Sequence, residues 1–340
     1  MTYAGGTMAA AMPAAPDAFH QARPRLHGIA YRMLGSVAEA EDLVQDLWIR
    51  WDATARDAVD NAEAWLVAAT TRLAIDRLRS AKIRRHAYEG IWLPEPWLDD
   101  DPATPEQTRA LADDVSLAFL LLMERLAPEA RAAFLLRDVF DADYADIGRI
   151  LGKSAAACRQ TVSRARTTMA LTGPRPSVPR EAHAAVMRRF AQALSAGDFA
   201  GLQDLIADDA RLMSDGGGKV KSFPVPLLGA RRIAQLFYAA HLRHGAGMRI
   251  QLAELNGRTA VLRIIEGVLE SAQSYETDGA RIVQVLVQRN PDKLARIAAA
   301  LAGQAAAGRE ESPGERPRAG QANDAGAGAR RTGPPIGRPT

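Results

Sequence analysis

The chain has 340 residues, of which 47% are hydrophobic and 24% are charged, and its formal net charge is +3. This length suits two or three globular domains, and the composition excludes fibrous and wholly disordered proteins. The single cysteine, Cys158, excludes an internal disulfide. No apolar run reaches the roughly 20 residues of a membrane helix, and the first residues lack the basic segment of a signal peptide. We therefore expect a cytoplasmic protein with no membrane partner.

Residues 1–16 are rich in Ala and Pro and are expected to be disordered. Apolar spacing predicts three helices over residues 17–88, with Ser36 and Asn61 as caps of the second and third. The second helix presents acidic side chains. The third begins near Trp65 and ends in a basic stretch, where one acid, Asp76, faces six basic residues: Arg72, Arg77, Arg79, Lys82, Arg84 and Arg85. This stretch can neutralise DNA phosphates, or it is a solvated helix end.

Residues 89–112 hold four prolines and three consecutive aspartates, which predicts a linker too irregular for the interior of a compact domain. A second helical block is expected over residues 113–171, with helices at 115–126, 128–139, 144–151 and 154–169. The last two, joined at Gly152, have the spacing of a helix-turn-helix. Its second helix turns polar side chains outward, as a major-groove reader does or as a solvated helical hairpin does: Ser154, Arg159, Gln160, Ser163, Arg164 and Arg166.

Residues 180–301 combine a helical stripe with alternating runs at 249–255, 258–265 and 281–288. Asn256–Gly257 is a two-residue hairpin signal, so we expect an α+β domain with an antiparallel sheet. Asp198 is expected to cap a helix that includes Ile206. Residues 302–340 lack apolar periodicity and are expected to be disordered.

The sequence contains no cofactor or metal motif, and we expect no bound cofactor and no metal. An enzyme would need an acid–base pair within reach of its substrate, and the third domain offers five candidates that no pattern marks as catalytic: Asp198, Asp215, Lys219, His241 and His244. We therefore expect no enzymatic activity, while an unidentified small-molecule ligand of this domain stays open.

The segments 41–46, 64–66 and 73–79 resemble the sigma-2 domain of extracytoplasmic-function (ECF) sigma factors, which belong to the sigma-70 family of RNA polymerase subunits. The helix-turn-helix and the preceding run 133–138 resemble their sigma-4 domain. This resemblance implies two all-α domains, a sigma-2 helical bundle and a sigma-4 helix-turn-helix, that direct core RNA polymerase to promoter DNA. Many relatives outside one subgroup of the family have Asn where this chain has Arg72, so the −10 preference stays open.

The family implies a role for each part. The acidic helix would dock on the clamp helices of the largest polymerase subunit through Asp42, Gln45 and Asp46, and sigma-4 would dock on the flap. The −10 element would be opened and read by Trp65, Arg72, Asp76, Arg77, Arg79 and Lys82. The −35 element would be read by the outward residues of the helix-turn-helix.

Three further motifs resemble the signatures of a SigJ-like subgroup, which carries a C-terminal α+β SnoaL-like cone domain. They are 92–96 in the linker, 215–219, and 290–294. The subgroup implies that this domain modulates the sigma factor in cis. We expect regulatory contacts from these residues: Trp92, Pro94, Pro96, Asp215, Gly216, Gly217, Gly218, Lys219, Asn290, Pro291, Asp292, Lys293 and Leu294. Trp97 is a further candidate anchor.

Three alternatives compete with this interpretation. In the first, the 215–219 loop is only a tight turn and the linker tryptophans pack locally. In the second, the protein is a stand-alone DNA-binding regulator, which would have no use for the acidic helix. In the third, it is a SnoaL-like enzyme with helical additions, which would hold a metabolite and lack affinity for DNA.

Overall fold

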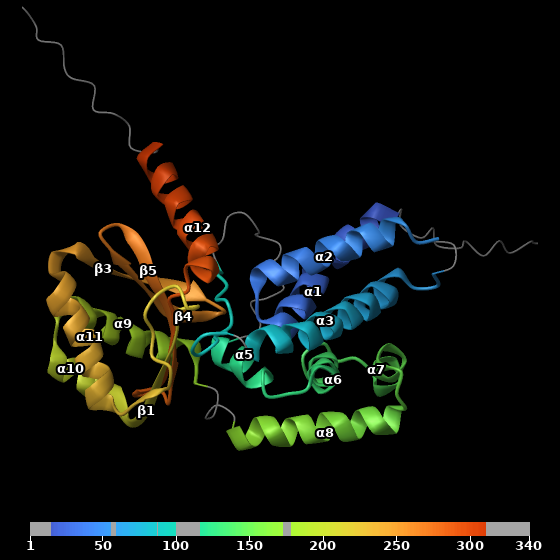
Figure 1. Cartoon of the computed structure of the whole chain (residues 1–340), viewed down its shortest axis with the longest axis horizontal. Coiled ribbons are helices and arrows are strands. Elements are labelled where there is room, and N and C mark those ends of the chain that lie inside the picture. The colour runs from blue at the N-terminus through green and yellow to red at the C-terminus, as the bar shows by residue number, and fades with distance from the viewer. Residues whose placement is uncertain (1–14, 56–58, 87, 100–115, 173–177, 311–340) are drawn as a thin grey trace, which may run out of the picture. The chain divides into compact units, whose positions relative to one another are not determined.

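The first helical module consists of three helices that pack along one another (Figure 1). This computed structural model describes residues 15–55, 59–86, 88–99, 116–172 and 178–310, and the chain divides into two units, residues 1–302 and 303–340. The helices are α1 (Ala15–Leu34), α2 (Val37–Asp52) and α3 (Ala62–His86). Ser36 accepts a hydrogen bond from the Glu39 amide at 3.3 Å, and Asn61 accepts one from the Ala64 amide at 2.9 Å. Both predicted caps are confirmed.

The second helical module contains α5 (Leu117–Met123), α6 (Pro128–Asp138), α7 (Tyr144–Leu151) and α8 (Ala155–Thr172). Helix α7 has the predicted bounds, and Gly152 ends it with φ 65°. Ser154 caps α8, because its hydroxyl accepts a hydrogen bond from the Ala157 amide at 3.2 Å. The sequence therefore places this helix-turn-helix almost residue by residue.

Both modules and the linker between them share one hydrophobic core, which includes Leu26, Trp97 and Phe134. Arg131 of α6 is 2% exposed and donates to the Met33 carbonyl at the end of α1, at 2.6 Å. The linker expectation was half right. Residues 91–96 form no helix or strand, but residues 93–98 are buried. An irregular segment can be buried when side chains from other elements satisfy its backbone groups.

The third domain begins with α9 (Arg180–Ala196), α10 (Phe199–Leu205), β1 (Ile206–Asp215), β2 (Leu227–Leu228) and α11 (Ala230–His244). It continues with β3 (Met248–Leu255), β4 (Arg258–Ile265), β5 (Val268–Thr277), β6 (Ile282–Gln288) and α12 (Pro291–Glu310). Its strand order is β2-β1-β6-β5-β4-β3. Strands β1 and β6 are parallel, so the expected antiparallel sheet is a mixed one. Ile206 starts β1 and is not part of the preceding helix.

The two faces of this sheet have separate cores. One face packs against α9, α10 and α11 through residues such as Phe190, Phe237 and Tyr275. The other face packs Leu262 and Ala272 against Leu294 of α12 and Leu98 of the linker. The alternation of side chains along each strand therefore puts neighbouring residues into different environments.

Across the described residues, no helix combines the length and the hydropathy needed to cross a bilayer.

Candidate DNA-binding and regulatory surfaces

The residues predicted to read the −35 element are all exposed: five lie on the outward face of α8, and Ser154 caps its start. Val162 and Ala165 on the opposite side are buried. The Arg159 guanidinium lies over the Tyr144 ring at 5.1 Å, and Arg166 makes two hydrogen bonds to Asp138. These contacts fix the direction of two cations beside an open helix face, which is the geometry that a groove-reading helix needs.

The basic side of α3 contacts the second module. Arg72 donates to the carbonyls of Ile150 and Arg149, at 3.0 and 3.1 Å, where α7 ends. A cation at a helix C-terminus is favoured by the helix dipole. Arg79 pairs with Glu129 of α6 at 2.5 Å and with Asp76 at 3.3 Å. Two predicted −10 arginines thus bind the other helical module.

Two other predicted −10 residues are placed differently. Trp65 is partly buried and its ring lies 5.3 Å from that of Trp51, so it belongs partly to the core. Arg77 donates to the Glu39 carbonyl at 2.7 Å and to Asp46 at 2.5 Å. The side chain of Lys82 lies outside the described residues.

The predicted docking residues Asp42, Gln45 and Asp46 lie on the exposed side of α2. A neighbouring acid on α2, Glu41, pairs with Arg296 of α12 at 2.5 Å. The third domain therefore reaches the docking helix by an ion pair that no sequence pattern predicts.

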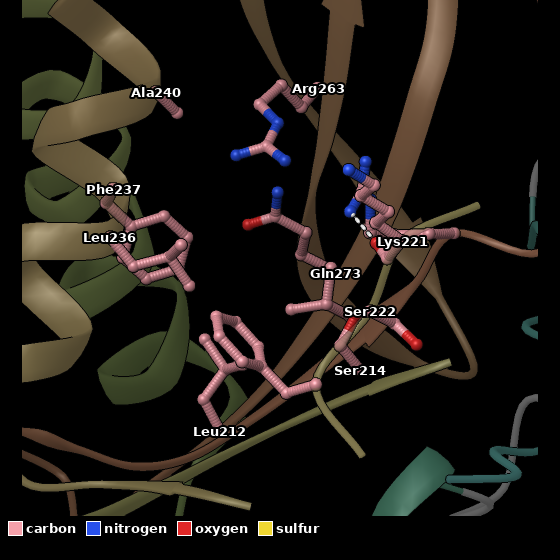
Figure 2. A pocket seen from close by; sticks show the side chains of 12 residues that line it. Leu212, Ser214, Lys221, Ser222, Leu236, Phe237, Ala240, Arg263 and Gln273 are labelled. Carbon is pink, nitrogen blue, oxygen red and sulfur yellow. Dashed lines mark hydrogen bonds between the residues drawn. The ribbon is translucent and has the colours of Figure 1, made fainter. Parts of the chain in front are cut away.

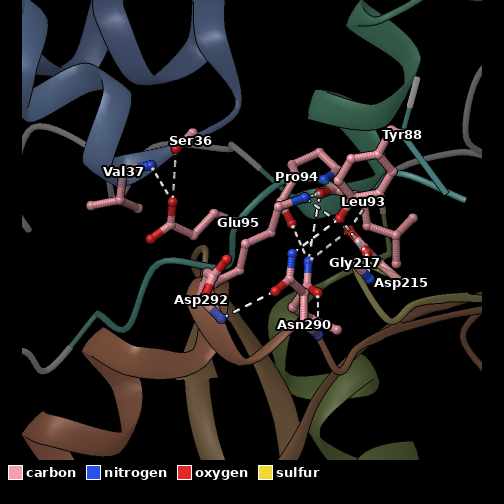
Figure 3. Close-up of polar contacts among 12 residues, drawn as sticks. Ser36, Val37, Tyr88, Leu93, Pro94, Glu95, Asp215, Gly217, Asn290 and Asp292 are labelled. Atoms are coloured by element: carbon pink, nitrogen blue, oxygen red, sulfur yellow. Dashed lines mark hydrogen bonds and ion pairs between the residues drawn. The ribbon is translucent and has the colours of Figure 1, made fainter. Parts of the chain in front are cut away.

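The linker is held by a carboxylate at the end of β1. Asp215 is 0% exposed and accepts hydrogen bonds from the Tyr88 hydroxyl at 2.6 Å and the Leu93 amide at 2.9 Å (Figure 3). Lys293 of α12 pairs with it at 2.8 Å. Burial raises the pKa of Tyr88, and its hydrogen bond to Asp215 raises it further, which keeps the hydroxyl a donor. We call the cluster of Tyr88, Asp215, Gln288 and Lys293 the linker clamp.

Lys293 and Gln288 extend the linker clamp to the linker carbonyls. The Lys293 ammonium donates to the Leu93 carbonyl at 2.6 Å and lies over the Trp92 ring at 4.4 Å. Gln288 at the end of β6 donates to the Pro94 carbonyl at 3.3 Å. Leu294 is buried against the sheet. The 215–219 and 290–294 motifs therefore both contact the 92–96 motif in the linker.

The glycines of the 215–219 loop are explained by close approaches. A Cβ at Gly216 would lie 2.1 Å from the Val220 carbonyl oxygen, and one at Gly217 would lie 2.3 Å from the Asn290 amide nitrogen. Gly217 and Gly218 have φ of 64° and 70°, which disfavour side chains. Lys219 pairs with Asp292 at 2.6 Å. The loop is a tight turn, as one alternative held, and it also contacts the 290–294 segment.

Glu95 in the linker caps the docking helix. It is 6% exposed and accepts hydrogen bonds from the Ser36 hydroxyl and the Val37 amide, both at 2.9 Å (Figure 3). Burial raises the pKa of Glu95 despite these donors. Pro94 and Pro96 on either side of it are buried. Glu95 is the one charged residue of the 92–96 motif, and this charge between two prolines is a sequence signal for a specific contact.

The hairpin turn at Asn256 makes contacts to other domains in addition to joining two strands. Asn256 has φ 54° and Gly257 φ 71°, as the predicted turn requires. The Asn256 side chain also accepts from the Trp97 amide at 3.0 Å and donates to the Tyr31 hydroxyl of α1 at 2.8 Å. Trp97, 1% exposed, packs edge-on against His27. This anchor joins the third domain, the linker and the first module.

The comparisons with known proteins agree with this architecture. Residues 18–83 match the family model of sigma-70 region 2, and residues 116–169 match that of sigma-70 region 4. The ECF RNA polymerase sigma factor SigJ of Mycobacterium tuberculosis (strain ATCC 25618 / H37Rv) is 34% identical over 292 residues, which cover 81% of this chain and 91% of SigJ. The probable ECF sigma factor SigI of the same strain is 29% identical over 83% of this chain and 95% of SigI.

A solved structure covers the third domain as well. The crystal structure of the M. tuberculosis ECF sigma factor SigJ superposes with a TM-score of 0.68 at 29% identity, over 83% of this chain and 98% of that one. The helical modules are therefore the sigma-2 and sigma-4 domains of a promoter-directing RNA polymerase subunit, followed by a SnoaL-like α+β domain. The chain belongs to the ECF sigma factor family and is SigJ-like in its domain content. It binds core RNA polymerase and promoter DNA to start transcription.

Proposed function

We propose that the residues predicted from the sequence divide the promoter between them. The exposed face of α8, with Arg159, Gln160 and Arg164, reads the −35 element in the major groove. Helix α3, from Trp65 onward, opens and reads the −10 element. Arg72 and Arg79 contact the end of α7 and Glu129 in this arrangement, and we propose that they exchange these contacts for DNA when the promoter binds.

The polymerase contacts follow the same pattern. The exposed acids Asp42 and Asp46 of α2, with Gln45, dock on the clamp helices of the largest subunit, and sigma-4 docks on the flap. The charge on α2 suits a basic partner surface, because opposite potentials guide encounter and set register. The ion pair between Glu41 and Arg296 lies beside this surface, so the third domain is positioned to influence docking.

Control in cis rests on one observation, the buried pair of Asp215 and Lys293 that holds the linker backbone. The same linker caps α2 through Glu95 and is part of the core that sigma-2 and sigma-4 share. Holding or releasing it therefore shifts the balance between a packed arrangement of the two sigma domains and one that can span a promoter. This is how we propose that the SnoaL-like domain modulates the sigma factor.

We further propose that the SnoaL-like domain has no catalytic role and instead takes a small-molecule ligand. Three of its five candidate acid–base residues serve other purposes in the described part of the chain. Asp198 caps α10, Asp215 holds the linker, and Lys219 pairs with Asp292. None of the five candidates lines the cavity between the sheet and α11.

Runoff transcription with purified core polymerase, on the DNA upstream of the gene itself, tests these proposals. The wild-type chain should direct a transcript from a defined start. Asp215→Asn, which removes the charge of the linker clamp, should change transcript yield, whereas Asp204→Asn at an exposed site on α10 should not. If a chain ending before Asn290 and Asp215→Asn both transcribe like the wild type, cis control through this contact is wrong.

A further inference from the structure

A cavity of about 260 Å³ lies between the sheet and helix α11 of the SnoaL-like domain (Figure 2). Its apolar wall comes from β1, β6, α11 and the segment after the glycine loop: Leu212, Phe223, Leu236, Phe237, Ala240 and Val287. An apolar cavity of roughly 150 Å³ holds benzene, so this one has room for a body of about ten non-hydrogen atoms by the same measure.

The polar wall of the cavity carries an excess of positive charge. Arg263 and Arg289 both pair with Glu270, at 2.6 Å each. Burial would raise the pKa of Glu270, but the two guanidiniums outweigh burial and hold it below its usual value. Glu270 is thus a single negative charge shared by two cations. The single carboxylate of Glu270 leaves one of these two guanidinium charges uncompensated, and the exposed Lys221 adds a third cation to the cavity lining.

Two buried donors without acceptors indicate the charge of the ligand that this cavity suits. The Ser214 hydroxyl and the Nε of Arg289 are buried and have no hydrogen-bond partner in the described structure, and both residues line the cavity. Ser214 is 3% exposed. A carboxylate is an acceptor-only group that can satisfy such donors, whereas an ammonium group would add donors and charge. Buried polar groups without partners mark a place where a ligand atom or water belongs.

We propose that this cavity binds a small apolar monocarboxylate, a deepening of the ligand role proposed above. Its carboxylate lies against the Arg263 and Arg289 side, with Ser214 as a further donor. Its hydrocarbon body lies among the apolar residues of α11. Two unsatisfied donors beside an apolar wall suit a carboxylate with a hydrocarbon body, because a phosphate carries close to two charges and three acceptor oxygens, more than these two donors can satisfy.

The cavity lies directly behind the linker clamp. Ser214, which lines the cavity, precedes Asp215 on β1, and Gln288, the last residue of β6, stands between the cavity residues Val287 and Arg289. Strands β1 and β6 pair in parallel with Asp215 opposite Gln288, and the Arg289 amide donates to the Asp215 carbonyl at 2.8 Å. A carboxylate bound on one face therefore contacts the residues next to those that hold the linker on the other.

Isothermal titration calorimetry of the full chain with octanoate, 1-octanol and octylammonium tests the class of ligand. Octanoate should bind, and the neutral and cationic analogues should bind at least tenfold more weakly. Ala240→Phe should fill the cavity and weaken octanoate binding tenfold or more, and so should Arg263→Gln, which removes one of the two guanidiniums that face the carboxylate. Ala239→Phe, at the exposed neighbouring position of α11, should bind like the wild type.

Two results overturn the proposal. One is octanol or octylammonium binding as tightly as octanoate, and the other is octanoate binding that is absent or unaffected by Ala240→Phe. The titration contains no polymerase, so its outcome is separate from cis control. Octanoate binding, combined with wild-type transcription by both Asp215→Asn and the chain ending before Asn290, keeps the site and rejects cis control. Altered transcription by Asp215→Asn without octanoate binding keeps cis control and rejects the ligand class.

Discussion

Replacing Asp215 by Asn should loosen the linker locally. Its carboxylate is fully buried, and the ammonium of Lys293, 13% exposed as a side chain, has it as an ion-pair partner at 2.8 Å. Removing one member of a buried pair leaves the other charge uncompensated, which costs about 3 kcal/mol even for a conservative change. Because about 1.4 kcal/mol is a tenfold change in an equilibrium, the open state of the linker should become roughly a hundredfold more populated.

Hydrogen exchange followed by mass spectrometry measures this opening directly. The peptide covering residues 91–98 contains the Leu93 amide, which donates to Asp215, and the Trp97 amide, which donates to Asn256. Its exchange should accelerate about a hundredfold if exchange follows local opening. A peptide from α8 in sigma-4 should be unaltered, and Asp204→Asn should leave both peptides unaltered.

A double variant isolates the pair from its surroundings. Asp215→Asn with Lys293→Met removes both charges, so its effect should be smaller than the sum of the two single effects by about 2 kcal/mol. If residues 91–98 of Asp215→Asn exchange hydrogen at the wild-type rate, the ion pair of Asp215 and Lys293 does not hold the linker. Additive single effects would show that the two charges act independently.

Three shorter predictions follow from other contacts. Burial beside Trp97 and the nearby Arg296 lower the pKa of His27 to about 4, below the 6.5 of the unfolded chain, so the unfolded state binds the extra proton. The wild type should therefore keep its full stability above pH 6.5 and lose roughly 2 kcal/mol by pH 5, and urea unfolding of His27→Phe should lack this loss. Gly217→Ala should lower the melting temperature and speed exchange of the 290–294 segment, and equal protection in both proteins would contradict the close approach described here. Arg159→Ala should weaken binding of a −35 duplex by sigma-4 about tenfold or more, as measured by fluorescence anisotropy at fixed salt, and an unaltered affinity would place the DNA elsewhere.

The sequence was most informative where local chemistry decides the structure. Ser154, Gly152 and the apolar spacing of α7 are contained within about twenty residues, and the structure places that helix-turn-helix as expected. Strand β5 escaped detection because its buried face is polar, with Ser271 and Gln273 among the residues on it. A strand that lines a polar recess lacks the apolar alternation that identifies strands.

Strand β1 was missed for a different reason. It follows α10 without an intervening turn, and the apolar pair Leu205–Ile206 continues the helical spacing across the boundary. No local pattern predicts the linker contacts, and the expectation of contacts from the 215–219 and 290–294 motifs comes from the family resemblance alone. Asp215 lies more than 120 residues from Leu93, and no local pattern encodes a partner at that separation. Family resemblance brought the three motifs to attention, but the roles of Tyr31 and Glu95 appear only in three dimensions.

Because Glu95 accepts from the first turn of α2, the boundary of a sigma-2 fragment cannot be chosen from the helices alone. A piece that stops after α3 would leave the Val37 amide to water and strip Trp97 from the side of His27. Such a fragment would contain a weakened polymerase-docking helix. Its loss of activity would then be wrongly attributed to the removal of an activating domain. Fragments meant to report on the sigma domains should therefore extend at least through Leu98.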